Sequence, residues 1–138
     1  MTYNLILPEN FQKVPLPGLT PWLEALRSGD YQQGTQRLAI KFDNSYRYCC
    51  LGLLCTIEKI PSKYKTNGYV YFNGSYTELQ VGIRQYDVLS SAGALPKGVD
   101  VVIVEIGVHY DYLAGLNDNG LTFLQIADIL EACFTHID

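Results

Sequence analysis

The residues best suited to chemistry are the cysteines, three of which lie in one stretch, Tyr46–Cys55, with the sequence YRYCCLGLLC. A cysteine at the start of a helix has its thiolate stabilised by the helix dipole, and Cys49 or Cys50 would occupy that position. His109 follows in the sequence, and Asn117 could orient its ring. Cysteine, histidine and asparagine occur in this order in papain-like hydrolases, so a cysteine-dependent hydrolase using Cys50, His109 and Asn117 is one hypothesis.

The same stretch also has the composition of a buried helix. Cys50, Leu53, Leu54 and Ile57 fall on one face at helical spacing. Free cysteine is among the most buried residue types, and no papain-like signature surrounds these cysteines. We therefore expect packed structural thiols, and the sequence favours a protein that binds over one that catalyses.

The soft metal ligands show no spacing typical of a metal site. No C-x-x-C pair occurs, and the separation of Cys50 from Cys55 is poor for structural zinc. Residues 117–120, Asn-Asp-Asn-Gly, lack the alternating oxygen ligands of a calcium loop and are better explained as a turn. We expect neither a metal nor another cofactor.

Tyrosines and arginines suggest a ligand surface. The chain has 11 tyrosines in 138 residues, and Tyr31 lies near Arg37 and Arg47 in the sequence. Aromatic rings stack on bases and arginines bind phosphates, so a nucleotide-like ligand fits this composition. Tyrosine is also frequent in protein interfaces and on half-buried strands, which leaves a protein partner and a plain sheet surface as alternatives.

Two polar loops add further candidates. Gln33 lies between an expected helix and an expected strand, where functional residues are often found. Asn117 and Asp118 precede the last expected helix, whose N-terminus could receive an anion. The candidate contact residues are Tyr31, Gln33, Arg37, Arg47, Asn117 and Asp118.

Charge and hydropathy exclude several classes of protein. A net charge of −4 argues against a protein that binds duplex nucleic acid through general attraction to phosphates. The longest apolar run, Val99–Val108, is interrupted by Asp100 and Glu105 and is too short to span a membrane. No signal peptide is recognisable at the start of the chain. We expect a cytoplasmic protein with free thiols.

The pattern of residues predicts an α+β fold in a single domain, residues 1–138, with an extended N-terminal arm, residues 1–19. About three helices should pack with a small, mainly antiparallel sheet. Thr20 is the expected N-cap of the first helix, and Thr122 and Gln125 form a capping box for the last one. The expected helices are 21–28, 49–59 and one that begins after Thr122; the expected strands are 3–7, 31–42, a hairpin of 69–72 with 75–79, and a central strand 99–108.

Three stretches carry a resemblance to a known group of proteins. Residues 22–34 read W-L-E-A-L-R-S-G-D-Y-Q-Q-G, residues 48–55 read Y-C-C-L-G-L-L-C, and residues 116–128 read L-N-D-N-G-L-T-F-L-Q-I-A-D. In this order they resemble a group of small uncharacterised proteins found mostly in bacteriophage genomes.

The resemblance implies a phage accessory protein acting in the cytoplasm of a bacterial host. Such a protein would interfere with a host pathway, including an immune pathway, by sequestering a small nucleotide signal or by blocking a host protein. A pocket shared across a symmetric homodimer would suit the capture of a nucleotide, so a homodimer is a further expectation.

Overall fold

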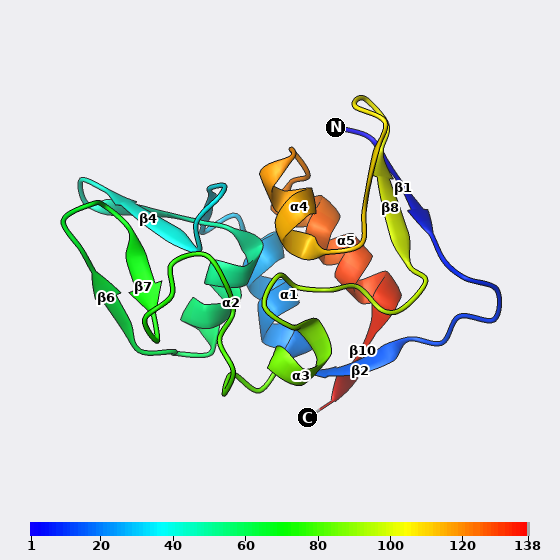
Figure 1. The fold of residues 1–138 in the computed structure, drawn as a ribbon, viewed down its shortest axis with the longest axis horizontal. Helices are drawn as coiled ribbons and strands as arrows, with labels where there is room; N and C mark the ends of the chain where they lie inside the picture. Colours follow the sequence, from blue (N-terminus) through cyan, green and yellow to red (C-terminus); the bar gives the residue numbers. More distant parts are fainter. Residues whose placement is uncertain (138) are drawn as a thin grey trace.

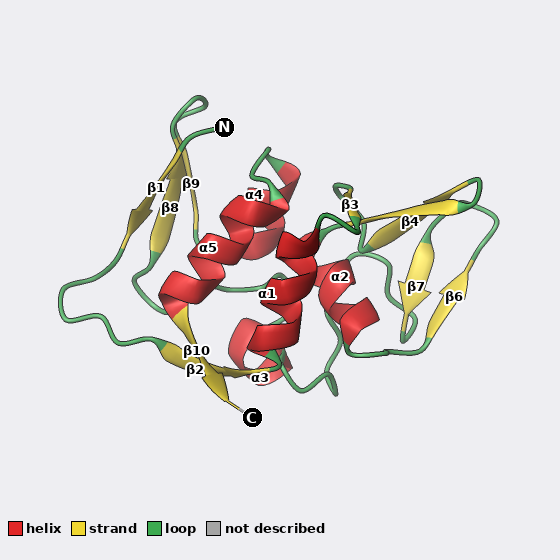
Figure 2. Ribbon diagram, turned by 180° about the vertical axis from the view of Figure 1, so that it is seen from behind, coloured by secondary structure: helices red, strands yellow, loops and turns green. Residues whose placement is uncertain are grey.

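A computed structural model describes residues 1–137 and confirms the α+β class, with helices at the centre and β-structure on two opposite sides (Figures 1 and 2). None of the helices in these residues is long and apolar enough to cross a membrane. The helices are α1 (Leu19–Ser28), α2 (Cys50–Ile57), α3 (Tyr86–Leu89), α4 (Leu113–Asp118) and α5 (Phe123–Cys133). The strands are β1 (Tyr3–Ile6), β2 (Val14–Pro17), β3 (Gln32–Gln33), β4 (Ala39–Phe42), β5 (Ser45–Tyr48), β6 (Ser62–Tyr64), β7 (Val70–Phe72), β8 (Asp100–Ile103), β9 (Val108–Tyr110) and β10 (Phe134–Ile137).

The strands form four small sheets instead of the one sheet that was expected. On one side of the helices, β8 lies between β1 and β9 in an antiparallel sheet. The parallel pair of β2 and β10 joins the N-terminal arm to the C-terminal strand. On the other side, β5 lies between β3 and β4, and β6 pairs with β7. An isolated bridge between Ile40 and Tyr69 connects these last two sheets.

The three expected helices are found as α1, α2 and α5, but the first and last residues of α1 and α2 differ in part from the expected ones. The first helix begins at Leu19, with Gly18 as the N-cap, so the expectation of Thr20 as N-cap is wrong. Pro21 is still tolerated because it lies in the first turn, where backbone N–H groups have no partner in the helix. The capping box of Thr122 and Gln125 is confirmed. The expected turn at 117–120 is partly wrong, because Asn117 and Asp118 form the end of α4.

The strand predictions fail where tertiary contacts interrupt a local pattern. The expected strand 31–42 is split into β3 and β4, because the backbone N–H of Gln36 turns away to the carboxylate of Asp118. The turn at Asn73–Gly74 forms and is closed by an isolated bridge between Phe72 and Ser75, but the ladder of β7 is with β6 and residues 75–79 form no strand. The expected central strand 99–108 is the central strand β8 followed by a turn into β9.

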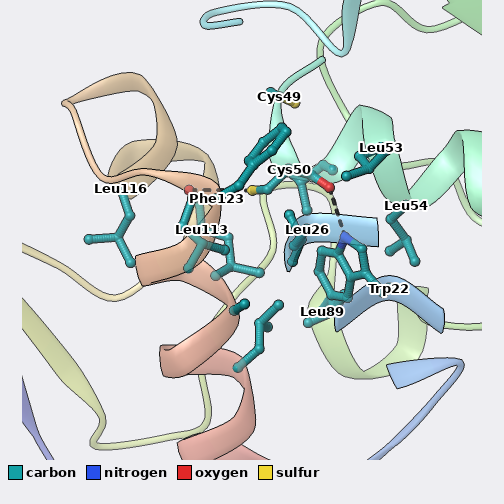
Figure 3. Packing of buried hydrophobic residues seen from close by; sticks show 14 of the residues in the cluster. Trp22, Leu26, Cys49, Cys50, Leu53, Leu54, Leu89, Leu113, Leu116 and Phe123 are labelled. Carbon is teal, nitrogen blue, oxygen red and sulfur yellow. Dashed lines mark hydrogen bonds between the residues drawn. The ribbon is translucent and has the colours of Figure 1, made fainter. Parts of the chain in front are cut away.

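Helices α1, α2 and α5 supply much of the hydrophobic core (Figure 3). Trp22 of α1 is 0% exposed, and its indole N–H donates to the carbonyl oxygen of Cys50 over 3.0 Å. A buried indole needs such a partner, because an unpaired buried donor costs about 1–3 kcal/mol. The bond therefore fixes the start of α2 against α1.

Gly52 allows α2 to approach the backbone of Leu38, the residue before β4, closely. A Cβ atom at this position would lie 1.7 Å from the carbonyl oxygen of Leu38 and 2.4 Å from its carbonyl carbon. The same carbonyl accepts a hydrogen bond from the N–H of Cys49 at 3.1 Å. The glycine in the cysteine-rich stretch is thus required by a backbone contact between α2 and Leu38.

We predict that Gly52→Ala destabilises the protein severely, by at least about 3 kcal/mol, because the clash is with backbone that no side-chain rotation can relieve. Thermal or urea unfolding followed by circular dichroism measures the loss. Gly29→Ala is the matched control: nothing lies within 4 Å of its Cβ position, so only the cost of its positive φ, about 1–2 kcal/mol, is expected. Equal losses in the two variants would contradict this account.

Candidate functional site

All four cysteines are free and buried in the core. Figure 3 shows two of them, Cys49 and Cys50, among the packed side chains. Cys49 is the N-cap of α2, and its sulfur accepts a hydrogen bond from the N–H of Gly52 at 3.3 Å. The thiol of Cys50 is 3.9 Å from the carbonyl oxygen of Leu113. The thiols therefore pack and cap, and none is presented to a substrate.

Burial also keeps these thiols protonated. It raises the pKa of Cys50 well above the ordinary value of 9.0, and it raises the pKa of Cys49 to about 11 and that of Cys55 to about 12. The thiolate is the nucleophilic form of cysteine. The start of α2 is therefore the opposite of an activating environment, despite the helix dipole.

The proposed partners of Cys50 do not assemble around its thiol. His109 lies on the exposed side of β9 and pairs through Nδ1 with the carboxylate of Asp100. Asn117 does reach Cys50, but its Oδ1 accepts from the backbone N–H of Cys50 at 3.1 Å. The described residues thus do not form a cysteine–histidine pair, which contradicts the hydrolase hypothesis.

Asn117 is the centre of a buried polar junction. Its side chain is 1% exposed, and all of its hydrogen-bonding positions are filled. Its Oδ1 also accepts from Nε2 of Gln33 at 2.9 Å, and its Nδ2 donates to the carbonyl of Gly34 at 2.9 Å and to Oδ1 of Asp118 at 3.4 Å. These bonds connect the loop after α1 with the first turn of α2 and the end of α4.

Gln33 closes the N-terminus of α5. Its Oε1 accepts from the N–H of Phe123 at 3.0 Å, and its Nε2 donates to the carbonyl of Leu121 at 2.8 Å. The N–H groups of Phe123 and Gln125 at this helix N-terminus are thus already bonded to side chains of the protein, which argues against the suggested anion site. Asn117 is buried and Gln33 half-buried, whereas Asp118 is exposed; all three side chains form hydrogen bonds within the fold.

The remaining candidates lie on or beside the two small sheets formed by β3 to β7, which we call the tyrosine lobe (residues 31–48 and 62–76). Side chains alternate between the faces of a strand, and residues paired across strands share a face. Lys41 pairs with Tyr46, and Tyr64 pairs with Val70, so these residues lie on what we call the inner face. Ile40 pairs with both Arg47 and Tyr69, which lie on the opposite, outer face.

The inner face contains a groove between β5 and β6, with a volume of about 370 Å³. No acidic residue lines the groove. Its lining residues are Tyr46, Tyr48, Thr56, Ile60, Ser62, Tyr64, Val70 and Phe72.

Lys41 holds a positive charge beside this groove. Its Nζ lies 4.8 Å from the ring centroid of Tyr64 and 5.8 Å from that of Tyr46. Among residues 1–137 no carboxylate forms an ion pair with it. The ammonium group therefore remains available for an anion.

The sequence-predicted contact residues thus lie in three places: the polar junction around Asn117, the edge of the inner groove, and the outer face of the lobe. Tyr31 packs edge-on against Tyr48, with ring centroids 5.8 Å apart, next to the inner groove. Arg37 and Arg47 lie on the outer face, over aromatic rings. The sequence prediction does not include Lys41 or Tyr64 among the site residues. For Tyr64 the reason is that residues 62–64 are not predicted as a strand. The alternation of Lys41, Tyr46 and Tyr48 across the turn at 43–44 is the signal that could have found part of the groove.

No group of three or more histidine, cysteine or acidic residues in positions 1–137 is arranged to hold a metal ion.

We predict that the thiols resist a thiol-reactive probe at pH 8 until the protein is unfolded. Below pH 9 both folded and unfolded states keep the thiols protonated, whereas between pH 9 and about 11–12 only the unfolded state ionises. The free energy of unfolding should therefore fall as the pH rises above 9. Thiolate absorbance and circular dichroism, recorded together, check this; rapid modification of Cys50 in the folded protein would contradict it.

We predict that Asn117→Ala costs about 3 kcal/mol or more, because it leaves the N–H of Cys50 and the carbonyl of Gly34 without partners. Asn119→Ala is the matched control, because it removes one bond of 2.7 Å from its Nδ2 to the carbonyl of Gly115 and should cost about 1 kcal/mol. Urea unfolding of both variants measures the difference. A small loss for Asn117→Ala would show that the junction does not stabilise the fold.

Comparison with known proteins gives one match. The family described as "Domain of unknown function (DUF8296)" matches residues 20–134, which span the helices, the polar junction and the tyrosine lobe. No curated protein and no solved structure matches the chain. Because the match covers most of the sequence, this chain belongs to the DUF8296 family.

Proposed function

We propose that this protein captures a small nucleotide-like ligand in the inner groove of the tyrosine lobe. The observation that carries the proposal is the position of Lys41, whose charge lies over two tyrosine rings and has no ion-pair partner among residues 1–137. Aromatic rings accept the flat face of a base, and an ammonium group binds phosphate. A groove of about 370 Å³ is within the range of small-molecule sites.

The charge distribution supports an anionic ligand despite the net charge of −4. Within residues 37–65 six basic residues accompany only two acidic ones, Asp43 and Glu58. Glu58 is already bound by Arg84, whose hydrogen bond is the main cause of the lowered pKa of that carboxyl. The lobe is therefore a local basic region on an acidic protein.

The biological setting is proposed from the resemblance to phage proteins. In the cytoplasm of a bacterial host, such a protein would sequester a nucleotide signal and so interfere with a host pathway, including an immune pathway. Blocking a host protein is the alternative, and a symmetric homodimer remains a proposal for the assembly.

Native mass spectrometry of the protein purified from bacteria tests capture directly. A bound mass of a few hundred daltons that absorbs near 260 nm and is released on denaturation is the expected result. A bare protein mass, with no binding of added nucleotides, would favour the blocking of a host protein. The same spectrum reports whether the protein is a dimer.

We predict that Lys41→Ala and Tyr64→Ala each weaken nucleotide binding about tenfold or more, which is the effect expected for a charge-assisted contact or a stacked base. Isothermal titration with nucleoside monophosphates and cyclic nucleotides measures the change. Lys97→Ala is the control, because it removes the same charge from an exposed position outside the lobe. Equal weakening by Lys41→Ala and Lys97→Ala would indicate general charge attraction and not a site.

A further inference from the structure

The outer face of the tyrosine lobe carries a continuous set of cations and rings that the inner groove does not use. Across the strands, Arg47 of β5 pairs with Ile40 of β4, and Ile40 pairs with Tyr69 at the start of β7. The guanidinium of Arg47 lies 4.8 Å from the ring centroid of Phe42, which is 49% exposed. This face therefore presents charge and aromatic surface together.

A ladder of stacked groups runs along the same face. The guanidinium of Arg37 lies 4.8 Å from the centroid of Tyr69, and the rings of Tyr69 and Tyr76 stack at 5.3 Å. Tyr71 follows at 4.9 Å from Tyr76, with Lys65 Nζ 4.0 Å from the ring centroid of Tyr71. The ladder thus has a cation at each end and tyrosines between them.

Beside the ladder, the outer face contains a shallow cavity with a volume of about 380 Å³. Lys63, Lys65 and Tyr71 line this cavity together with the turn at Asn73–Gly74. No carboxylate among residues 1–137 forms an ion pair with Arg37, Arg47, Lys63 or Lys65. Elsewhere in the molecule, by contrast, Arg27 and Arg84 are held by Asp128, Glu131 and Glu58.

We propose that the outer face binds single-stranded nucleic acid. Neighbouring strands lie about 4.8 Å apart, so the backbones at Arg47 and Lys65, three strands apart, are separated by about 14 Å. A chain of phosphates can contact both positions at once, one phosphate at each cation. The flat tyrosine and phenylalanine rings add surface on which unpaired bases stack without regard to sequence.

Duplex nucleic acid and an acidic protein fit this face less well. Paired bases cannot reach the rings, and the rest of the chain, with four basic and twelve acidic residues, repels a second row of phosphates. An acidic peptide would neutralise the cations but has no bases to stack on the rings. This inference goes beyond the proposed function and concerns the opposite face of the lobe.

Fluorescence anisotropy with a labelled oligodeoxythymidine of about ten nucleotides tests the proposal on the full chain. Binding should weaken with salt, and each phosphate contact contributes about −0.7 to the slope of log K against log salt. Lys65→Ala and Arg47→Ala should each reduce the slope by about that amount. Tyr71→Ala should weaken binding at least about fivefold with the slope unchanged.

The controls separate this site from the groove and from general charge. Lys97→Ala and the groove variant Tyr64→Ala should leave oligonucleotide binding unchanged. Since Arg47 and Lys65 are exposed, their variants test the proposal even if Tyr71→Ala does not fold. Kd values above about 100 µM at low salt, or an equal loss with Lys97→Ala, would overturn it. Competition by poly-glutamate at equal charge would also overturn it, in favour of an acidic protein partner.

Discussion

The fold depends on one buried side chain, the amide of Asn117. With both Oδ1 and Nδ2 fully bonded, it joins the loop after α1, the first turn of α2 and the end of α4, which are far apart in sequence. A buried amide stabilises only when every position is satisfied, since each unpaired group costs about 1–3 kcal/mol. The hydrogen bonds of Asn117 are therefore complete only when all three segments are in their folded positions. These are also the three stretches that carry the resemblance to phage proteins, so those motifs have a direct structural explanation.

The cysteine-rich stretch has a similar role in seating α2. Gly52 lies against the carbonyl of Leu38, and Cys49 is the N-cap of the helix. The backbone carbonyl of Cys50 accepts a hydrogen bond from the indole N–H of Trp22. The segment is thus built for close backbone contact, which requires small side chains at the contact point. Through Leu38 and Ala39 the same contact connects the helical core to the tyrosine lobe.

The basic residues fall into two groups with different surroundings. Arg27 and Arg84 join elements of the fold through carboxylates, at 2.9 Å for Arg27 with Asp128. The cations of the lobe instead lie over aromatic rings. Arg37 also donates to the carbonyl of Gln36 and to the hydroxyl of Tyr69, whereas no carboxylate among residues 1–137 forms an ion pair with Lys41 or Lys65. Because the lobe has two faces, its two small sheets, joined by the bridge between Ile40 and Tyr69, can present a groove on one side and an open cationic surface on the other.

Local sequence determined the features of this protein whose causes are local. The capping box of Thr122 and Gln125, the turn at Asn73–Gly74 and the buried helix after Cys49 each depend on neighbours within a few residues, and each is found. The α+β class followed from the same signals.

Tertiary structure alone decided which residues meet. The sequence suggests that Gln33 and Asn117 are loop residues available to a ligand. In the structure their side chains form a hydrogen bond with each other across 84 positions of the chain, which no neighbouring residue indicates. His109 was placed with Cys50 by order along the chain, but strand pairing puts it on β9 beside Asp100. The two faces of the lobe depend on the register of five strands, and a shift of one residue would exchange them. That register comes from long-range pairing, which no single segment of the sequence contains.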